Sequence, residues 1–302
     1  MIRLQVKNLN LSQIADSGQC FRWKKIRDES SDSFYFLIPA LGKVLPVSQE
    51  KETFKFYCTQ EEFEKLWKPY FDLENDYGAF IKNIPPKDSY LKQAAEKGSG
   101  IRILKQEFFE TTVSFIISQN NNISRIKNSI EFLSQNFGSL NQDLKDMDLP
   151  EPFLSGKTTP VHNFPGPESF ASFSDNELLK LFKTAGLGYR DTFLLGFIRL
   201  AENTPSIITG LKGIPYENAM EKLLEIKGIG PKVANCIALF SLHFLGACPV
   251  DTWIKKIIKN RYDGTKPEWM NSNPDDCNYR PGGVYQQYVF NYERNLLSQN
   301  KR

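Results

Sequence analysis

Apolar and polar residues alternate in the first part of the chain. Ile2, Leu4 and Val6 would lie on one face of an extended strand. Three more short runs rich in aromatic and β-branched residues follow, at 33–38, 44–47 and 53–57. A period of two, interrupted by turn residues, is typical of strands with one buried face. The pattern therefore predicts a small antiparallel β-sheet at the N-terminus.

From residue 61 onward the apolar period becomes helical, and Phe63, Leu66 and Tyr70 fall on one helical face. Most of the remaining chain has the same period. It predicts helices at 88–97, 107–118, 122–136, 175–185, 189–203, 216–226, 231–245, 251–261 and 282–298. The polar and proline-containing segments 139–173 and 263–281 are expected to be loops. We therefore predict an α+β fold, with an N-terminal antiparallel sheet domain at 1–90 and a mostly α-helical body at 91–302.

A chain of 302 residues is long enough for one large domain or two ordinary ones. Its most apolar stretch, 233–250, contains Asn235, Ser241 and His243, so we expect a buried helix and no membrane span. The N-terminus alternates like a strand and does not resemble a signal peptide. An intracellular protein, in the bacterial cytoplasm or a nucleus, is therefore expected.

Charge alone does not indicate a partner, because the formal net charge is only +3 and the sequence pI is about 8.4. Nucleic-acid binding would need local clustering of positive charge. One cluster follows residue 251 and consists of Lys255, Lys256, Lys259 and Arg261. A solvated helix face would have the same composition.

Cysteine and histidine usage excludes several kinds of chemistry. The five cysteines form no Cys-x-x-Cys pair, which favours reduced thiols. Only two histidines are present, so a histidine-ligated metal site or a Ser-His-Asp triad is hard to build. Catalysis would depend on lysine, aspartate or glutamate.

The segment 224–232 reads Leu-Glu-Ile-Lys-Gly-Ile-Gly-Pro-Lys and predicts a helix, a tight hairpin and a second helix. Gly228 and Gly230 permit positive φ and would let a phosphate oxygen reach backbone N–H groups at a helix N-terminus. Pro231 suits the first helical position, where its missing N–H is not needed. This helix-hairpin-helix pattern favours binding of a DNA backbone over a plain helical turn.

Lys232 opens the second helix, and Asp251 follows that helix and a return loop. A helix N-terminus and partial desolvation both disfavour a charged lysine, and a neutral amine can attack the anomeric carbon of a sugar. The alternative role for Lys232 is phosphate binding. Asp251 is expected to cap the next helix, and its carboxylate could also stabilise positive charge on a deoxyribose ring as a base departs. Together the two residues indicate an enzyme that acts on DNA.

Four further motifs occur in order along the chain. They are Ser-Gly-Gln-Cys-Phe-Arg-Trp at 17–23, Ser-Gln-Asn-Asn-Asn-Ile-Ser-Arg at 118–125, Gly-Leu-Gly-Tyr-Arg at 186–190 and Tyr-Gln-Gln-Tyr-Val-Phe at 285–290. The hairpin with Pro-Val-Asp at 249–251 resembles the helix-hairpin-helix DNA glycosylase superfamily. The other motifs narrow the resemblance to the 8-oxoguanine DNA glycosylase family, over most of the chain. The resemblance implies a lesion pocket between the sheet domain and the helical body.

The resemblance also implies roles for single residues around a flipped-out base. The Gly18 carbonyl would accept the N7–H that distinguishes 8-oxoguanine from guanine. Cys236 and Phe290 would enclose the base, Gln286 would read its Watson–Crick edge, and Pro249 would line the pocket. From the sequence pattern alone, Cys236 and Phe290 would be ordinary core residues.

A second group is implied to surround the cytosine left unpaired. It consists of Asn120, Arg125 and Arg190, with Tyr189 as a wedge in the base stack. An arginine that donates to the acceptors of cytosine would favour lesions opposite that base. Without the resemblance, the amide run at 120–122 between two helices predicts helix capping.

The resemblance implies a bifunctional DNA glycosylase and β-lyase. Lys232 would displace 8-oxoguanine and form a Schiff base with the sugar, and β-elimination would cut the strand. The expected partner is double-stranded DNA with oxidised guanine opposite cytosine, and the protein is expected to be a monomer. No metal or organic cofactor is expected for the chemistry, although the hairpin carbonyls could hold a structural monovalent cation.

Three alternatives remain open. A glycosylase for alkylated adenine would usually lack the lysine, and many endonuclease III-like enzymes carry a four-cysteine iron–sulfur loop, whereas only Cys277 follows residue 251. A non-catalytic DNA-binding protein would leave Asp251 and Gln286 without a function. One departure from the family pattern is Trp253, where some members carry a histidine two residues past the aspartate.

Overall fold

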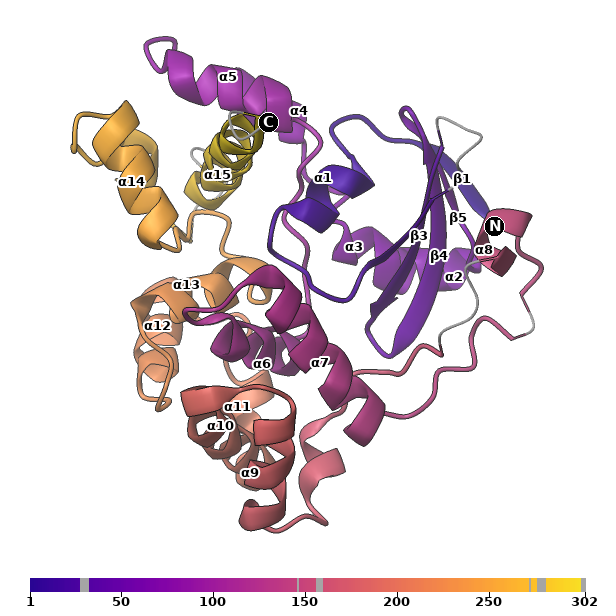
Figure 1. The fold of residues 1–302 in the computed structure, drawn as a ribbon. Helices are drawn as coiled ribbons and strands as arrows, with labels where there is room; N and C mark the ends of the chain where they lie inside the picture. Colours follow the sequence, from indigo (N-terminus) through magenta and orange to yellow (C-terminus); the bar gives the residue numbers. More distant parts are fainter. Residues whose placement is uncertain (28–32, 146, 156–159, 272, 276–280, 300–302) are drawn as a thin grey trace.

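The computed structural model describes residues 1–27, 33–145, 147–155, 160–271, 273–275 and 281–299, and Cys277 lies outside them. Five strands form one antiparallel sheet in the order β1–β5–β4–β3–β2 (Figure 1). The strands are β1 (Ile2–Gln5), β2 (Lys24–Arg27), β3 (Phe34–Ala40), β4 (Lys43–Glu50) and β5 (Thr53–Phe56). The predicted N-terminal antiparallel sheet is confirmed.

The pattern of apolar residues did not indicate β2, because its sequence is Lys-Lys-Ile-Arg. This strand lies at the edge of the sheet, where it pairs with β3 on one side only. Charged residues are common on edge strands because they oppose pairing with a second molecule. The four residues of β2 therefore lack the apolar alternation by which β1, the other edge strand, was recognised.

Each face of the sheet is covered by other parts of the chain. Against one face pack the short helices α1 (Leu11–Asp16) and α3 (Lys68–Tyr70) and the π-helical turn η1 (Phe63–Trp67), which follows α2 (Gln60–Glu62). The other face contacts α8 (Glu151–Ser155), whose Phe153 ring lies 5.3 Å from the rings of both Tyr35 and Tyr57. The segment 139–173, expected to be a long loop, thus contains a helix that covers the sheet (Figure 1).

The remaining chain is helical and holds the larger hydrophobic core. Its α-helices are α4 (Tyr77–Lys82), α5 (Ser89–Gly98), α6 (Phe108–Ser118), α7 (Ile123–Phe137), α9 (Asp175–Thr184), α10 (Asp191–Asn203), α11 (Ser206–Thr209), α12 (Tyr216–Leu224), α13 (Pro231–Phe240), α14 (Thr252–Arg261) and α15 (Gly282–Gln299). Short 3-10 turns are η2 (Pro167–Phe170), η3 (Gly188–Arg190) and η4 (Glu268–Asn271).

The predicted helix at 231–245 is too long, because α13 ends at Phe240. His243 has φ +66°, which no helix continues through. Leu245 and Ala247 are nevertheless buried, so the apolar run reflects burial of the return loop as well as of the helix. This loop brings Pro249 and Asp251 back beside α13.

The sheet and the helical body meet along the chain segment that follows α5. Arg102 is buried there and donates hydrogen bonds to the carbonyl oxygens of Lys7, Asn8 and Asp72. Helix α5 itself packs against α15 at the far end of the chain (Figure 1). The division of the chain near residue 90 stays a prediction.

None of the helices in the described part of the chain is both long and apolar enough to cross a membrane. Cys20, Cys58, Cys236 and Cys248 are free thiols, as the cysteine spacing indicated. No group of His, Cys, Asp and Glu among the described residues could hold a metal ion.

Candidate active site

The predicted hairpin joins α12 to α13, and its two glycines have different conformations. Gly228 has φ +93°, and a Cβ at this position would lie 2.5 Å from the Phe193 side chain. Gly230 has φ −92°, so the expectation of positive φ is wrong for this residue. Gly230 is the N-cap of α13 and Pro231 occupies its first turn, and no side chain among the described residues caps the N-terminal N–H groups of α13.

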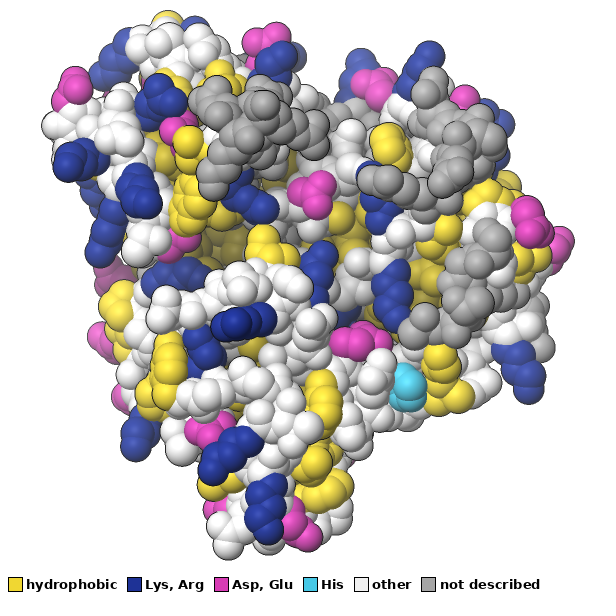
Figure 2. Space-filling model, viewed as in Figure 1, with side chains coloured by type: hydrophobic (Ala, Val, Ile, Leu, Met, Phe, Trp, Pro, Cys, Tyr) yellow, Lys and Arg dark blue, Asp and Glu magenta, His cyan; other side chains and the backbone are white. Residues whose placement is uncertain are grey.

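A cleft of about 920 Å³ opens beside the hairpin, and it brings the two proposed catalytic residues together. Gly230, Lys232 and Asp251 all line it. Figure 2 shows the molecule hollowed between the helices α14 and α15 and the helices α7 and α13, with apolar side chains in the hollow and Lys or Arg around its rim. Residues far apart in the sequence thus form one concave site.

Lys232 projects toward an aromatic surface. Its Nζ lies 5.3 Å from the centre of the Phe115 ring, which stacks on Phe240 and also contacts Phe21. Cys236, one helical turn later, is 3% exposed. Burial raises the pKa of the Cys236 thiol, and the side chain of Lys232 opposes that rise. The amine therefore lies at the border between the solvent-filled cleft and the apolar core.

Asp251 is the N-cap of α14, as predicted. Its Oδ1 accepts hydrogen bonds from the N–H groups of Trp253 and Ile254, each at 2.9 Å. Among the described residues, no hydrogen bond reaches Oδ2. The two capping hydrogen bonds thus fix the carboxyl group through one oxygen, and Asp251 lines the same cleft as Lys232.

Gly18 and Phe290 meet at the other side of the cleft, although they come from opposite ends of the chain. Gly18 has φ +81°, and a Cβ there would lie 3.9 Å from Cε1 of Phe290. Both residues line the cleft. Cys236 and Gln286 are buried behind its surface, at 3% exposure each. Of the five predicted base-pocket residues, Gly18 and Phe290 therefore line the cleft, whereas Cys236, Pro249 and Gln286 are buried and do not line it.

The amide of Gln286 is only half satisfied. Its Nε2 donates to the carbonyl oxygen of Pro249, whereas its Oε1 is buried and has no hydrogen-bond partner among the described residues. A buried amide oxygen without a partner is unfavourable by about 1–3 kcal/mol. The Gln286 oxygen therefore has an unused acceptor position, which is covered in this structure.

Gln19 holds the Gly18 turn in place. It is 1% exposed, and its Nε2 donates to Ser17 Oγ and to the Arg102 carbonyl oxygen, each at 2.9 Å. Its Oε1 accepts the N–H of Leu104 at 2.8 Å. This buried network fixes the backbone on the C-terminal side of Gly18.

The α6–α7 loop carries the amide run at 120–122. Asn122 caps α7 through its Oδ1, which accepts the N–H of Arg125 at 2.9 Å, so the capping interpretation is confirmed. Asn120 has φ +45° and lines the cleft. Arg125 is exposed on the first turn of α7. Asn120 therefore lines the cleft, whereas Arg125 lies on the exposed first turn of α7 and is not among the lining residues.

Arg190 and Tyr189 approach the same loop from η3. The Arg190 guanidinium is 7% exposed and donates to the carbonyl oxygens of Gln119, Asn120 and Leu187, at 2.6, 2.8 and 2.9 Å. Tyr189 is 54% exposed and lines the cleft. In this structure Arg190 supports the loop backbone, while the Tyr189 ring is presented to solvent.

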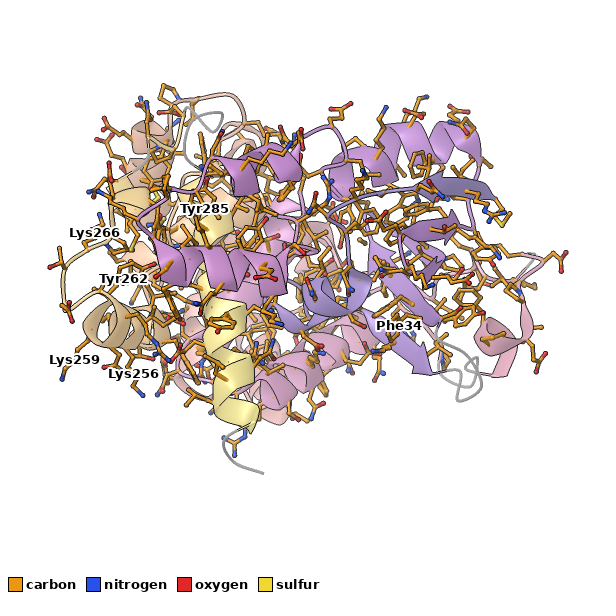
Figure 3. All side chains as sticks on the ribbon, turned by 90° about the horizontal axis from the view of Figure 1, so that it is seen from above. Phe34, Lys256, Lys259, Tyr262, Lys266 and Tyr285 are labelled. Atoms are coloured by element: carbon orange, nitrogen blue, oxygen red, sulfur yellow. The ribbon has the colours of Figure 1, made fainter. Side chains whose placement is uncertain are left out.

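The four residues of the basic cluster after residue 251 have different surroundings. Lys255 lines the cleft, and Lys256 and Lys259 project from α14 at one edge of the molecule (Figure 3). Arg261 instead pairs with Glu293 at 3.2 Å. Positive charge therefore extends from the cleft along the exposed face of α14.

Comparison with known proteins identifies the family of this chain. Residues 1–112 match the family described as 8-oxoguanine DNA glycosylase, N-terminal domain. The crystal structure of Clostridium acetobutylicum 8-oxoguanine glycosylase/lyase, in complex with double-stranded DNA containing cytosine opposite 8-oxoguanine, is 33% identical. Its TM-score is 0.79, and the match covers 97% of this chain and 94% of that one. The chain belongs to the 8-oxoguanine DNA glycosylase family.

More distant members of the family match as well. The N-glycosylase/DNA lyase of Saccharomyces cerevisiae is 29% identical over 285 residues, covering 86% of this chain and 70% of that protein. The N-glycosylase/DNA lyase of Arabidopsis thaliana is 27% identical over 280 residues, covering 86% and 68%. The predicted fold class and family are thereby confirmed.

Several residues of this family member were not identified from the sequence. Gln119, Phe115 and Arg294 line the cleft. Trp253, which the sequence singled out as a departure from the family pattern, also lines the cleft, and its ring meets the Phe290 ring edge to face at 6.4 Å. Only Gln119 lies within a quoted motif, and no spacing rule connects Arg294 or Phe115 with residues elsewhere in the chain.

Proposed function

We propose that this protein is a bifunctional DNA glycosylase and β-lyase that removes 8-oxoguanine from duplex DNA, preferably opposite cytosine. The observation that carries the proposal is the meeting of Lys232 and Asp251 in one cleft at the N-terminus of a hairpin-flanked helix. Family membership and the relatives named N-glycosylase/DNA lyase support both activities. A role in DNA repair would require the protein to be in the compartment that holds the DNA, which is the bacterial cytoplasm or a nucleus.

The hairpin would bind the DNA backbone. The N–H groups at the start of α13, which no side chain in the described part of the protein caps, and the positive end of its dipole suit a phosphate, and Gly230 leaves space for close approach. The lysines on α14 would add attraction that falls with salt. DNA held in this way would place a sugar beside Lys232.

The proposed chemistry uses the amine as nucleophile. Lys232 Nζ forms a bond to C1′ as the bond from C1′ to the base breaks, and the base leaves with a proton. Ring opening then gives a Schiff base between Lys232 and the sugar. Loss of a C2′ proton expels the 3′ phosphate, and hydrolysis of the imine releases the lysine. Asp251 stabilises positive charge at C1′ through its carboxylate.

Base selection is assigned to the other side of the cleft. The carbonyl of Gly18 would accept the N7–H of 8-oxoguanine, whereas guanine would present a lone pair there and be rejected. The unpaired Oε1 of Gln286 supports a role as acceptor for an N–H on the Watson–Crick edge. Cys236 and Phe290 would enclose the ring, and Pro249 would hold the Gln286 amide.

The opposite strand is assigned to the α6–α7 loop and η3. Tyr189 would fill the space left by the flipped base, and its exposure suits a wedge. Asn120, Arg125 and Arg190 would contact the unpaired cytosine. Arg190 would have to release a backbone carbonyl to do so, or act through the loop that it supports.

No metal or organic cofactor enters this scheme, because an amine and a carboxylate carry it. A monovalent cation bound by the hairpin carbonyls would stabilise the hairpin and take no part in the chemistry. The protein is proposed to act as a monomer on double-stranded DNA.

Borohydride trapping tests the reaction. Wild-type protein should be covalently trapped on duplex DNA with 8-oxoguanine opposite cytosine, and Lys232→Gln should abolish trapping. Trapping that survives this substitution would exclude Lys232 as the nucleophile. A panel with each opposite base, alkylated adenine and oxidised pyrimidines, scored for base release and nicking, would show whether another lesion is preferred.

A further inference from the structure

Arg294 occupies a position in the cleft that none of the assigned roles explains. It projects from α15, one helical turn after Phe290, and lines the cleft. Its guanidinium carbon lies 5.5 Å from the centre of the Phe290 ring. Its Nη1 donates a hydrogen bond to the carbonyl oxygen of Asp16 at 2.8 Å.

Through these two contacts Arg294 connects the segment that leads into Gly18 with the Phe290 ring. Asp16 is the last residue of α1 and lies two residues before Gly18. Phe290 is the ring that lies against Gly18, with 3.9 Å between its Cε1 and the Cβ position of that glycine. Gln19 fixes the Gly18 turn from its C-terminal side, and Arg294 fixes it from its N-terminal side.

We infer that Arg294 is a positioning residue for base excision, which sets the distance between the Gly18 carbonyl and the Phe290 ring. The inference rests on the proposed function, since it assigns the Gly18 side of the cleft to base selection. A cation over an aromatic face fixes the ring, and the hydrogen bond fixes the turn. Neither contact touches Lys232, so Arg294 serves recognition of the base and has no part in the lyase step.

This separation makes the inference testable, because the lyase step can be measured without a base. A duplex that already contains an abasic site requires Lys232 but leaves the base pocket empty. Arg294→Ala should slow single-turnover release of 8-oxoguanine by about 10-fold, which corresponds to the loss of one cation–π contact and one hydrogen bond. Cleavage of the abasic duplex should stay close to the wild-type rate.

Conservative variants separate the two contacts. Arg294→Lys keeps a cation near Phe290 and a donor for Asp16, so it should restore part of the release rate. Arg294→Gln keeps only a donor and should resemble the alanine variant more closely. The ratio of base release to abasic cleavage, measured on the same preparation, does not depend on the fraction of folded protein.

A matched control removes a positive charge without entering the cleft. Lys92 is exposed on α5, which packs against α15. Lys92→Ala should leave the ratio unchanged. If Arg294 instead binds a DNA phosphate, Arg294→Ala will weaken DNA binding and slow both reactions in parallel, and the inference is wrong. An unchanged ratio would overturn it as well.

The wild-type measurement distinguishes this outcome from failure of the proposed function. If wild-type protein cleaves abasic DNA but releases no 8-oxoguanine, the proposed substrate is wrong. In that case the same ratio is measured with the lesion of the panel that the wild-type protein does release. Arg294→Ala should again lower base release relative to cleavage of abasic DNA.

Discussion

The side-chain amide of Gln119 donates a hydrogen bond to the carbonyl oxygen of Gly228 at 3.0 Å, between the α6–α7 loop and the hairpin. The backbone carbonyl of Gln119 in turn accepts the Nε–H of Arg190 at 2.6 Å. One residue thus connects the hairpin that precedes Lys232 with the loop that carries Asn120. The proposed contacts to the two DNA strands are therefore mechanically linked inside the protein.

Replacing Gln119 with leucine should loosen this link. The Gly228 carbonyl would lose its side-chain partner, and we expect the free energy of unfolding to fall by about 1 kcal/mol. Because the hairpin positions DNA for both steps, base release and cleavage of abasic DNA should slow together. Urea unfolding and single-turnover assays on both substrates measure these effects.

Gln135→Leu is the matched control. Gln135 is an exposed residue of α7 whose Nε2 bonds Glu131 at 3.1 Å, away from the cleft. Its replacement should change neither activity. Equal losses in the two glutamine variants would show that the Gln119 bridge has no specific role.

The hairpin glycines should respond differently to alanine. At Gly228 the positive φ alone is unfavourable for alanine by about 1–2 kcal/mol, and overlap with Phe193 adds to this. At Gly230 φ is −92° and no atom lies within 4 Å of the Cβ position. Gly228→Ala should therefore lower the melting temperature clearly, whereas Gly230→Ala should fold normally and bind DNA more weakly.

Gly213→Ala provides the comparison for backbone strain without overlap. Gly213 has φ +76° and open space at its Cβ position. Its alanine variant should be less destabilised than Gly228→Ala. Normal DNA affinity of Gly230→Ala, measured by fluorescence anisotropy, would contradict close phosphate approach at the hairpin.

The stability of the protein should fall in mildly alkaline solution. Burial raises the pKa of the Cys20 and Cys236 thiols, while a thiol in the unfolded chain loses its proton near pH 8.5, its approximate ordinary pKa. Above that pH the folded state holds more protons than the unfolded state, so the free energy of unfolding decreases as pH rises. Below it, both states are protonated and these thiols contribute no pH dependence.

Urea unfolding at about pH 7.5 and about pH 9.5 measures this decrease. Cys20→Ala removes one buried thiol, so the difference between the two pH values should be smaller in this variant. Its stability at the lower pH will also change because of the cavity, which makes the difference the relevant quantity. An unchanged difference would show that Cys20 titrates normally in the folded protein.

The fold could be predicted from the sequence where one local pattern determined one element. The alternation in 53–57 and the caps around α7 and α14 are of this kind. The local pattern of apolar and polar residues did not predict an element where contacts with distant parts of the chain stabilise it. Strand β2 has one apolar residue, and α8 lies in a proline-containing loop, yet pairing with β3 and burial of Phe153 stabilise them.

The candidate site shows the same division. Lys232, Gly230 and Asp251 follow from a continuous motif and its adjacent helix. Gln119 and Arg294 gain their relevance from partners far along the chain, namely Gly228 and Asp16. Such pairs cannot be recognised from one sequence, because no local period connects them.

Asp251 offers a way to separate structure from catalysis in one side chain. Asparagine caps helices as well as aspartate, so Asp251→Asn can keep the two hydrogen bonds from Trp253 and Ile254. We expect its melting temperature to stay near that of the wild type. The neutral amide cannot stabilise positive charge at C1′, so single-turnover release of 8-oxoguanine should fall by about 100-fold or more.

Asp251→Ala removes the cap as well and should also destabilise the protein by about 1 kcal/mol. The two variants should therefore have similarly low activity but different stability, as measured by thermal unfolding and base release. If Asp251→Asn retained wild-type activity, the carboxylate would serve α14 alone. The negative charge of Asp251 would then have no part in the reaction.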